Sequence, residues 1–515
     1  MAVEIELKLR IAPEQLAKLK RHALLKVHQV TRPLTHRLHN IYYDTLKLDL
    51  HKSGMALRLR HAGRQWLQTL KGGGSVQAGL HQRNEWEVPV NRPALDFSAT
   101  QAVEWDEHLR PSLRKKLQPV FVTDFSRTSR MLLWRGAQIE LCVDRGEVST
   151  EQRSTPICEL ELELKSGEPQ QLYELALAIL EIVPFELETV SKAEQGYRLL
   201  SGYAEHPVKG VVPALARTDT LADVLKTLIW SCLQHFQDNL SGAMERGAMG
   251  SGDAEYLHQM RVALRRLRVV LRMAEKARAD QQLAGLYKDV SDLCVALGRI
   301  REWDVFIAQT VQPMCKRMAG HAGLQALLAA SERQGAACYA ALRGAAQARE
   351  LQRLLLRFAI WMNGAYWQQT GWQQHTATVQ PAHDFATRRL HKLAKRFASS
   401  GQHLNSDDAA RLHALRIVAK KLRYSAEFFA ALYDKKKAGS YLAALSVVQD
   451  LLGQINDVAV AHRLLDELAA DAALAAHQEA VVLAKGWIAH DLSGQLTALR
   501  KSMQNFNKQP VFWKK

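Results

Sequence analysis

Polar and apolar residues alternate strictly from Glu4 to Arg10. Successive side chains of an extended strand point to opposite faces, so Glu4, Glu6, Lys8 and Arg10 would share one face. The same alternation returns over residues 159–165, with the sequence Glu-Leu-Glu-Leu-Glu-Leu-Lys. One such strand is explained by an apolar face on the core and a polar face in water. Carboxylates that face each other across a ladder repel, so acid-lined strands at both ends of a domain favour neutralisation by a divalent cation.

Further short alternating segments lie between these two strands. They predict a largely antiparallel sheet that curls or closes, and they cover residues 40–45, 54–60, 66–71, 83–87, 125–134 and 139–144. The run 72–75, Gly-Gly-Gly-Ser, lacks the Gly-Lys-Ser/Thr ending of a phosphate loop, so it predicts a flexible hairpin connection. Residues 13–25 predict an amphipathic helix.

The charged faces of these strands carry residues of both signs. The acids are Glu4, Glu6, Glu85, Asp144, Glu161 and Glu163, and the bases are Lys8, Arg58, Arg60, Lys71, Arg83, Arg127 and Lys192. Inside a closed barrel, arginine and lysine would hold phosphate oxygens, and carboxylates would hold magnesium or manganese bridging to those oxygens. The alternative is a solvated, salt-bridged face. It is favoured for any single strand, but it explains the whole set less well.

Beyond about residue 218 the pattern becomes helical. Alanine and leucine are dense, proline is rare and apolar residues recur at helical spacing, which predicts an all-α region. Residues 204–217 contain Pro207, Gly210 and Pro213 without periodicity, so they predict a linker. The predicted domains are therefore 1–203 and 218–515, joined by 204–217.

The helical region contains an internal repeat. Residues 257–268 resemble residues 412–423, and His258 aligns with His413 at an offset of 413 − 258 = 155. The same offset relates Leu297-Gly298 to Leu452-Gly453. A constant offset over this distance predicts a duplicated helical unit.

Each copy of the repeat places basic residues on one helix face. The candidates are His258, Arg261, Arg265, Arg266, Arg268 and Arg272 in the first copy, and His413, Arg416, Lys420, Lys421 and Arg423 in the second. Glu427 stands where the second copy would have its last base. A basic surface helix whose stems cover apolar neighbours would explain one copy. Like charges at this spacing destabilise an isolated helix, so two copies that both begin with histidine favour a polyanion site.

Composition agrees with a polyanionic partner. The 515-residue chain has a formal net charge of +17 and a pI of about 9.6, which favours phosphate polymers, nucleic acid or a membrane surface. Its six cysteines lack Cys-x-x-Cys spacing, so we expect reduced thiols. We find no apolar run long enough to span a bilayer and no signal sequence. The expectation is a soluble cytoplasmic protein that does not bind membranes.

The N-terminal motifs resemble those of the CYTH superfamily, the triphosphate tunnel metalloenzymes. Glu4-Ile5-Glu6-Leu7-Lys8 resembles its ExExK signature, and matching segments follow in order at 43–45, 55–60, Lys71, 83–85, 144–146, 159–163 and 191–197. The resemblance spans residues 1–203 and implies an eight-stranded antiparallel tunnel that binds a triphosphate with Mg²⁺ or Mn²⁺. It implies metal-side roles for Glu4, Glu6, Asp144, Glu161 and Glu163, and phosphate contacts by the seven bases named above.

This resemblance also implies chemistry. Phosphoryl transfer needs neutralised equatorial oxygens and an in-line water. Glu161 or Glu163 would orient that water, or a second metal would lower its pKa. These alternatives stay open, and the catalytic candidates are Glu161, Glu163 and Lys8.

The second half resembles the CHAD domain, a helical domain with conserved histidines that often follows CYTH. The resemblance covers about residues 218–510 and implies two related four-helix bundles that bind inorganic polyphosphate in a basic groove. Its Leu-Gly-x-x-x-Asp segments differ in one respect, because Glu302 stands where the second copy has Asp457. The overall prediction is an α+β protein: a β tunnel with flanking helices, then an all-α domain of two repeated four-helix bundles.

The leading functional prediction is hydrolysis of inorganic triphosphate in the tunnel, with polyphosphate bound by the helical domain, in some cases at polyphosphate granules. Related tunnels hydrolyse thiamine triphosphate or cyclise ATP, so these substrates remain alternatives. A non-catalytic polyphosphate-binding protein is another. Nucleic-acid binding is the weakest, because no aromatic stacking platform or reader motif accompanies the basic helices.

Overall fold

The computed structural model describes the chain except for residues 1, 99–108, 246–253, 368–380, 402–407 and 515. The described residues form two compact units. The first contains Met1–Glu205 and Arg349–Tyr366, and the second contains His206–Ala348 and Trp367–Lys515. Residues 204–216 between the halves contain no helix or strand, and the domain limits expected from the sequence stay a prediction.

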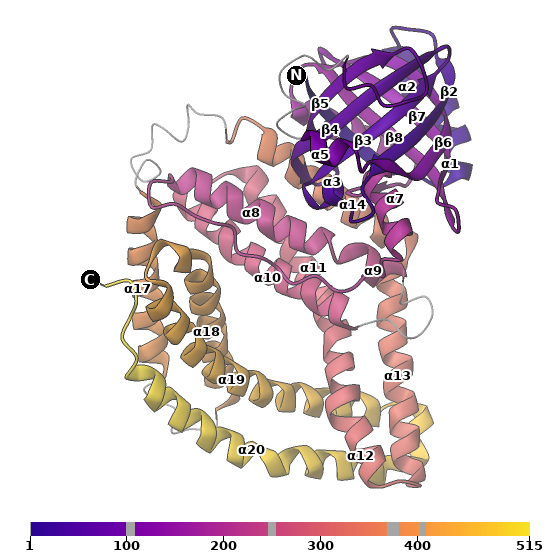
Figure 1. Cartoon of the computed structure of the whole chain (residues 1–515). Coiled ribbons are helices and arrows are strands. Elements are labelled where there is room, and N and C mark those ends of the chain that lie inside the picture. The colour runs from indigo at the N-terminus through magenta and orange to yellow at the C-terminus, as the bar shows by residue number, and fades with distance from the viewer. Residues whose placement is uncertain (1, 99–108, 246–253, 368–380, 402–407, 515) are drawn as a thin grey trace. The chain divides into compact units, whose positions relative to one another are not determined.

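Eight antiparallel strands close into a barrel in the first unit (Figure 1). They are β1 (Ala2–Arg10), β2 (Leu34–Asp44), β3 (Met55–Ala62), β4 (Gln65–Gln77), β5 (Leu80–Val90), β6 (Gln118–Trp134), β7 (Ala137–Ser149) and β8 (Ser154–Ser166). Their order is β5-β4-β3-β2-β6-β7-β8-β1, and β1 also pairs with β5, which closes the sheet. A short ninth strand, β9 (Glu186–Leu187), pairs with β1 at Leu9 and Arg10, beyond the start of β5.

The alternation of the strands decides what faces the barrel interior. Leu7 and Leu9 on β1 and Leu160 and Leu162 on β8 are fully buried, and helix α6 (Pro169–Leu180) packs against both strands. Because their outer faces are covered by apolar packing, the charged faces of β1 and β8 point inward. This confirms the predicted tunnel.

Shorter helices flank the barrel. They are α1 (Pro13–Arg21), α2 (Ala23–His28), α3 (Asp49–Lys52), α5 (Pro111–Arg114) and α7 (Lys192–Ser201). The helix predicted over 13–25 is interrupted at His22, whose backbone is extended (ψ 143°) and whose Nδ1 accepts a hydrogen bond from the Leu24 amide.

The hairpin predicted at 72–75 was wrong. Strand β4 continues through the glycines with a register shift between Gly72 and Ser75, and the chain reverses at Ala78 and Gly79. Gly74 adopts φ +95°, and a Cβ there would lie 1.8 Å from the carbonyl oxygen of Gln82. The glycine run therefore forms a bulge in which the neighbouring strand approaches closely.

The second unit is helical, and its helices follow the predicted repeat. The first copy contains α8 (Leu221–Gln237), α10 (Ala254–Ala277), α11 (Gln281–Phe306) and α13 (Ala322–Arg343), and the second contains α17 (Ala382–Gly401), α18 (Ala409–Phe429), α19 (Lys435–Ala469) and α20 (Gln478–Asn507). Helices α10 and α18 begin 155 residues apart, at Ala254 and Ala409. The connecting elements are α9 (Leu240–Glu245), η2 (Ile307–Val311), α12 (Gln312–Arg317), η3 (Ala430–Leu432) and η4 (Ala472–His477).

Helices from both copies share a hydrophobic core. Trp303 and Phe306 on α11 belong to the same buried cluster as Leu464 and Leu465 on α19. Helices α10 and α18 also contact each other. The two copies are therefore packed together within one unit.

One helix lies outside the repeat. Helix α14 (Ala345–Asn363) follows the first copy in sequence, but residues from Arg349 onward belong to the barrel unit. The buried side chain of Gln352 accepts a hydrogen bond from the Leu187 amide of β9 (3.1 Å), and Arg353 pairs with Glu181 (2.7 Å). The barrel unit thus includes a helix encoded between the two helical repeats.

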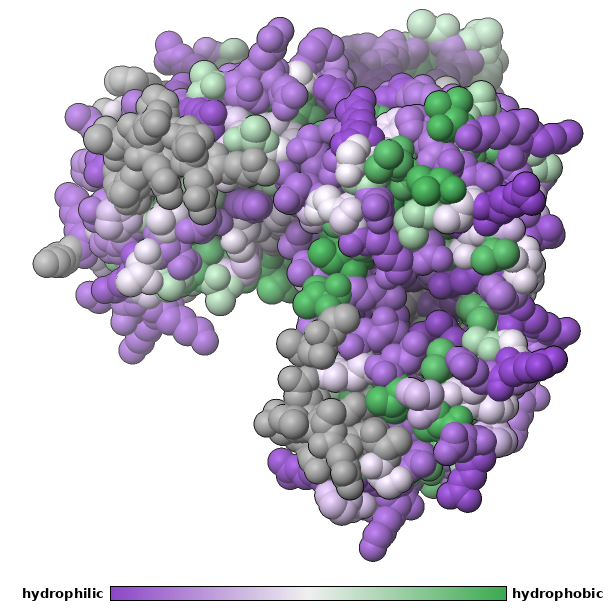
Figure 2. Space-filling view, turned by 90° about the horizontal axis from the view of Figure 1, so that it is seen from above, coloured by the Kyte–Doolittle hydropathy of each residue, from purple (hydrophilic) through white to green (hydrophobic). Residues whose placement is uncertain are grey.

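The face seen in Figure 2 is largely hydrophilic, with hydrophobic residues in small separate groups. In the described part of the chain, no helix combines the length and the apolar character needed to span a bilayer.

Candidate functional site

The barrel encloses a small cavity of about 60 Å³ whose lining carries both signs of charge. Ten of the residues predicted from the sequence line it: Glu4, Glu6, Lys8, Arg58, Arg60, Lys71, Arg83, Arg127, Glu161 and Lys192. The strands therefore bring together side chains that lie up to 188 positions apart, from Glu4 to Lys192.

Two lysines lie among the buried carboxylates. Lys8 forms ion pairs with Glu161 and with Glu6 (2.9 Å). Lys192 forms ion pairs with Glu159, Asp144 (2.6 Å) and Glu161 (2.9 Å). Burial alone would lower the pKa of both lysines, but the neighbouring carboxylates raise it above its ordinary value. Both ammonium groups are therefore held in the charged form.

Arg127 ties two acids together. It lies opposite Asp144 on the β6–β7 ladder, and its guanidinium donates to both carboxylate oxygens of Asp144 and to Glu161. Burial would raise the pKa of each acid, but the cations outweigh it. Lys192 and Arg127 lower the pKa of Asp144, and Arg127, Lys192 and Lys8 hold that of Glu161 well below its usual value.

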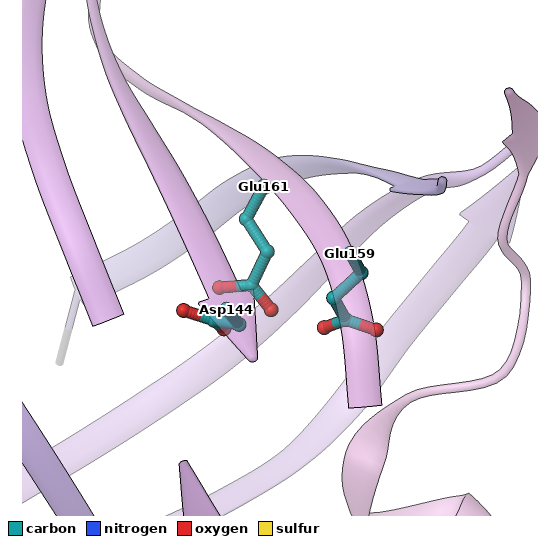
Figure 3. A group of neighbouring side chains, drawn as sticks. All are labelled: Asp144, Glu159 and Glu161. Carbon is teal, nitrogen blue, oxygen red and sulfur yellow. The ribbon is translucent and has the colours of Figure 1, made fainter. Parts of the chain in front are cut away.

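Three carboxylates converge deep in the barrel. Figure 3 shows Asp144, Glu159 and Glu161, whose nearest carboxylate oxygens all lie within 4.8 Å of one another. Burial, reinforced by Glu161 and Asp144, raises the pKa of Glu159 to about 7, although Lys192 and Lys8 act in the opposite direction. Buried carboxylate oxygens that repel one another suit a hard divalent cation. The donor set therefore fits a metal ion such as Mg²⁺ or Mn²⁺.

The sequence prediction left Glu159 out of the metal set. The residue shares the inward face of β8 with Glu161 and Glu163, so the alternation itself could have identified it. Glu163 lies opposite Glu6 but is more exposed and pairs with Lys165 (2.5 Å). The roles predicted for these acids stay predictions.

Strands β3, β4 and β5 carry further bases of the predicted set. Lys71 pairs with Glu4 and with Glu85 (3.3 Å), and Arg58 lies 3.5 Å from Glu85. The buried Nε of Arg58 has no hydrogen-bond partner among the described residues. A buried donor without an acceptor is costly, so a ligand oxygen at this point would relieve the penalty.

Arg60 is bound by a neutral side chain, whereas Arg58 and Lys71 lie close to carboxylates. Its Nε donates to Oδ1 of Asn40 (2.8 Å). Burial, together with the nearby Arg58 and Arg127, lowers its pKa to about 10. Crowded cations of this kind favour the arrival of an anion.

His81 was not predicted and also lies on the inner face. It is opposite Glu6 on the β1–β5 ladder and 1% exposed. Burial and the nearby Lys8 lower its pKa to about 3, although Glu6 raises it. The imidazole is therefore neutral.

The helical unit contains a much larger cavity of about 1830 Å³, which we call the basic groove. All eleven polyphosphate-binding candidates line it: His258, Arg261, Arg265, Arg266, Arg268, Arg272, His413, Arg416, Lys420, Lys421 and Arg423. Arg301, Arg389, Lys392, Arg396 and Arg463 also line it but were missed, because they lie outside α10 and α18, the two helices whose basic faces the sequence predicted. Arg266 is the least available, since it lies over the Phe428 ring and donates to the Gly210 carbonyl (3.4 Å).

Repulsion among cations is strong in the basic groove. Burial and the nearby Arg265 and Arg416 lower the pKa of Lys420 to about 6. Burial and Arg265 lower the pKa of Arg261 to about 10. Among the described residues, buried guanidinium nitrogens of Arg261, Arg268 and Arg416 have no hydrogen-bond partner.

Acids offset only part of this charge. Glu427, which stands where the second copy would have its last base, pairs with Arg423 (2.8 Å). Glu302, which aligns with Asp457, pairs with Arg463 (2.5 Å). The basic groove remains dominated by cations from both copies.

A closed antiparallel tunnel with a charged interior, followed by a duplicated helical unit with a basic groove, defines a two-domain class of protein. Residues 2–197 match the CYTH domain and residues 227–466 match the CHAD domain. The chain therefore joins a CYTH domain to a CHAD domain, as the motifs predicted.

Known proteins resemble each half. An inorganic triphosphatase of Haemophilus influenzae is 34% identical over 203 residues, which cover 39% of this chain and 55% of that protein. The match thus spans about half the length of that relative. The CHAD domain from the plant Ricinus communis shares 31% sequence identity at a TM-score of 0.50, covering 60% of this chain and all of that one. A Hippeastrum protein described as having a dominant triphosphatase activity is 20% identical, with a TM-score of 0.30, and covers 39% of this chain and 97% of that one.

Proposed function

We propose that the tunnel hydrolyses inorganic triphosphate to diphosphate and phosphate with a divalent metal ion, and that the basic groove binds inorganic polyphosphate. The observation that carries the first part is the position of Lys8 between Glu6 and Glu161, inside a cavity lined by six further arginines and lysines of the predicted set, Arg58, Arg60, Lys71, Arg83, Arg127 and Lys192. Bases and acids in one enclosed space match a phosphate chain and its cation together.

Substrate binding would replace the ion pairs between the buried bases and carboxylates by contacts between those bases and phosphate. Lys8, Arg127 and Lys192 now bind carboxylates, and phosphate oxygens would take the place of those carboxylates. The released acids Asp144, Glu159 and Glu161 would hold Mg²⁺ or Mn²⁺, with Glu4, Glu6 and Glu163 as further candidates. The metal would supply charge neutralisation of the phosphate oxygens.

Basic residues of the tunnel would bind the phosphate chain and stabilise the charge that develops during hydrolysis. Arg58 offers an Nε that has no partner among the described residues, and Arg60 and Lys71 line the same cavity. Donors fixed in a dry cavity stabilise the charge that develops on the transferring phosphoryl group. The catalytic roles of Lys8, Glu161 and Glu163 are proposed on this basis.

The description of the relative as an inorganic triphosphatase supports inorganic triphosphate as the substrate. Hydrolysis of thiamine triphosphate and cyclisation of ATP remain alternatives that a substrate panel distinguishes.

Polyphosphate binding rests on the buried arginine nitrogens of the basic groove for which the described residues provide no acceptor. The groove is about thirty times larger than the tunnel cavity, from 1830 against 60 Å³. A long polyanion would satisfy those donors and relieve the repulsion that lowers the pKa of Lys420. Recruitment to polyphosphate granules would follow from this binding.

The tunnel is tested by turnover. Purified protein with Mg²⁺ or Mn²⁺ should release phosphate from triphosphate faster than from thiamine triphosphate or ATP. Glu6→Gln and Lys8→Ala should lower kcat by at least about 100-fold, whereas the exposed controls Glu147→Gln and Lys18→Ala should not. Normal turnover by Glu6→Gln and Lys8→Ala would exclude a catalytic tunnel and favour a binding protein.

The basic groove is tested by retention on immobilised polyphosphate. Arg265→Glu combined with Lys420→Glu should abolish retention at physiological salt without changing triphosphate turnover. Lys288→Glu combined with Lys435→Glu makes the same number of base-to-acid substitutions on exposed residues outside the groove. Competition with duplex DNA at matched salt separates polyphosphate from nucleic acid. Retention that survives the groove substitutions means that polyphosphate binds elsewhere.

A further inference from the structure

Asn40 is buried in the wall of the tunnel, next to one of the bases that line the cavity. It lies on β2, opposite Arg60 on β3 and opposite Thr123 on β6. Asn40 and Thr123 are both 0% exposed, whereas Arg60 lines the cavity. Three neighbouring strands therefore place these side chains in one row that reaches the cavity through Arg60.

The contacts of the Asn40 amide define which way it points. The side chain of Arg60 has only donors, so the atom 2.8 Å from its Nε must be the amide oxygen, Oδ1. Nδ2 then donates to the hydroxyl oxygen of Thr123 (2.9 Å) and to the backbone carbonyl of the same residue (3.4 Å). The amide is held from both sides, and its orientation depends on no protonation state.

Most bases of the cavity are held by carboxylates. Ion pairs engage five of them: Lys8, Arg58, Lys71, Arg127 and Lys192. Arg60 forms no ion pair with any described residue, and its hydrogen-bond partner is the neutral Asn40. Arg60 therefore carries a positive charge that no ion pair within the described part of the tunnel neutralises.

This arrangement leaves one edge of the Arg60 guanidinium for a ligand. A guanidinium presents five N–H donors in a rigid fork, and the contact with Asn40 occupies Nε. Its two Nη groups have no hydrogen-bond partner among the described residues, and such a pair matches two oxygens of one phosphate group. A phosphate could bind Arg60 without displacing a carboxylate, whereas at Lys8 or Arg127 it would have to displace one.

We propose that Asn40 is a positioning residue that holds Arg60 as the preformed phosphate contact of the tunnel, a role that rests on the proposed triphosphate hydrolysis. Its neutral oxygen fixes the guanidinium and leaves the charge of Arg60 for the substrate. A side chain that is ordered before the substrate arrives loses less conformational entropy on binding. Asn40 is not among the residues that line the cavity, so it acts through Arg60.

A purely structural role is the competing explanation. In that case Asn40 matters only because its amide links β2 to Thr123 of β6. Three variants separate the two contacts. Asn40→Leu removes both, Asn40→Thr keeps a hydroxyl for Thr123 but is too short to reach Arg60, and Thr123→Val removes the hydroxyl while the contact with Arg60 remains.

A double-mutant cycle on the full chain provides the test, because turnover of triphosphate reports on the tunnel and not on the basic groove. Asn40→Leu and Asn40→Thr should each lower kcat/KM for triphosphate by about tenfold, the usual effect of losing a hydrogen bond to a charged group. The loss should appear mainly in KM, since the contact serves binding. In an Arg60→Met background the same substitutions should cost little more, because Asn40 acts through Arg60.

Each other outcome contradicts a stated part of this role. Losses that add to that of Arg60→Met would show that Asn40 acts independently of Arg60. A KM raised as much by Thr123→Val as by Asn40→Leu would assign Asn40 to the structural link, and an unchanged KM in Asn40→Thr would exclude positioning even if Asn40→Leu failed to fold. Lack of turnover by the wild-type protein would refute the proposed function itself, whereas wild-type turnover with an additive cycle would refute only the role of Asn40.

Discussion

Arg127 donates to both carboxylate oxygens of Asp144, at 2.8 Å from Nε and 2.6 Å from Nη2, and the Asp144 side chain is completely buried. An uncompensated buried charge is strongly destabilising. Arg127→Met should therefore lower the free energy of unfolding by about 3 kcal/mol, at the low end of the usual range because Lys192 still contacts Asp144. Denaturant unfolding measures this loss.

The same sheet supplies the control. Arg37 pairs with Asp124 through the same two-pronged geometry, at 3.0 and 3.2 Å, but its side chain is 81% exposed. Exposed pairs contribute little. Arg37→Met should therefore be far milder, and similar losses in both variants would contradict the importance of burial.

Metal affinity should depend more on Glu159 than on Glu163. Glu159 belongs to the buried three-carboxylate cluster, whereas Glu163 is paired with Lys165. Glu159→Gln should weaken Mn²⁺ binding by at least about tenfold, and Glu163→Gln should weaken it less. Calorimetric titration of metal into substrate-free protein checks this order, and the reverse order would favour the set expected from the sequence.

Polyphosphate binding should depend on pH through Lys420. Its pKa of about 6 means that it is mostly uncharged at pH 7, whereas in the unfolded chain it is charged up to about pH 10. The unfolded state thus binds more protons between these values, and this residue makes the ligand-free protein more stable as pH rises through that window. The charged groups acting on Lys420 are Arg261, Arg265, Arg416 and Asp457.

A bound polyanion favours charged Lys420, so binding should take up a proton and affinity should fall between pH 6 and 8, by about tenfold for each unit that the pKa rises on binding. Calorimetry in buffers of different ionisation enthalpy detects the proton. Lys420→Arg stays charged and should remove most of the dependence. An unchanged pH profile in that variant would exclude Lys420 as its source.

Gln352 should slow hydrogen exchange at the Leu187 amide of β9. Its side chain is the acceptor of the buried Leu187 amide, so Gln352→Leu leaves that amide unsatisfied at a cost of about 1–3 kcal/mol. Hydrogen exchange at Leu187 should accelerate, while exchange in β6 and β7 should change little. Arg353→Gln removes a partly exposed ion pair with Glu181 and serves as the control. Unaltered exchange in Gln352→Leu would mean that α14 does not support β9.

The alternation of charged and apolar residues along the strands was sufficient to predict which residues lie together inside the barrel. Glu4, Lys8, Arg58 and Glu161 were placed on charged faces, and closure of the sheet turns those faces to one cavity. Alternation could not reveal Asn40, because a lone asparagine in a strand carries no signal until its contacts with Arg60 and Thr123 are seen.

Other features depend on contacts between distant segments. The bulge at Gly72–Ser75 follows from the close approach of β5, so the glycine run was misread as a turn. In the helical half, the 155-residue repeat predicted the basic faces of α10 and α18. Arg389 and Arg396 were missed because they enter the basic groove from α17, whose sequence lacks the repeated motif.

The membership of α14 in the barrel unit has a practical consequence. A gene fragment that stops at the Pro-containing connection would encode every strand but omit the helix whose Gln352 meets Leu187. The two halves therefore cannot be separated at that connection, and a graft of the barrel unit onto another protein would leave this unit incomplete unless residues 349–366 were included.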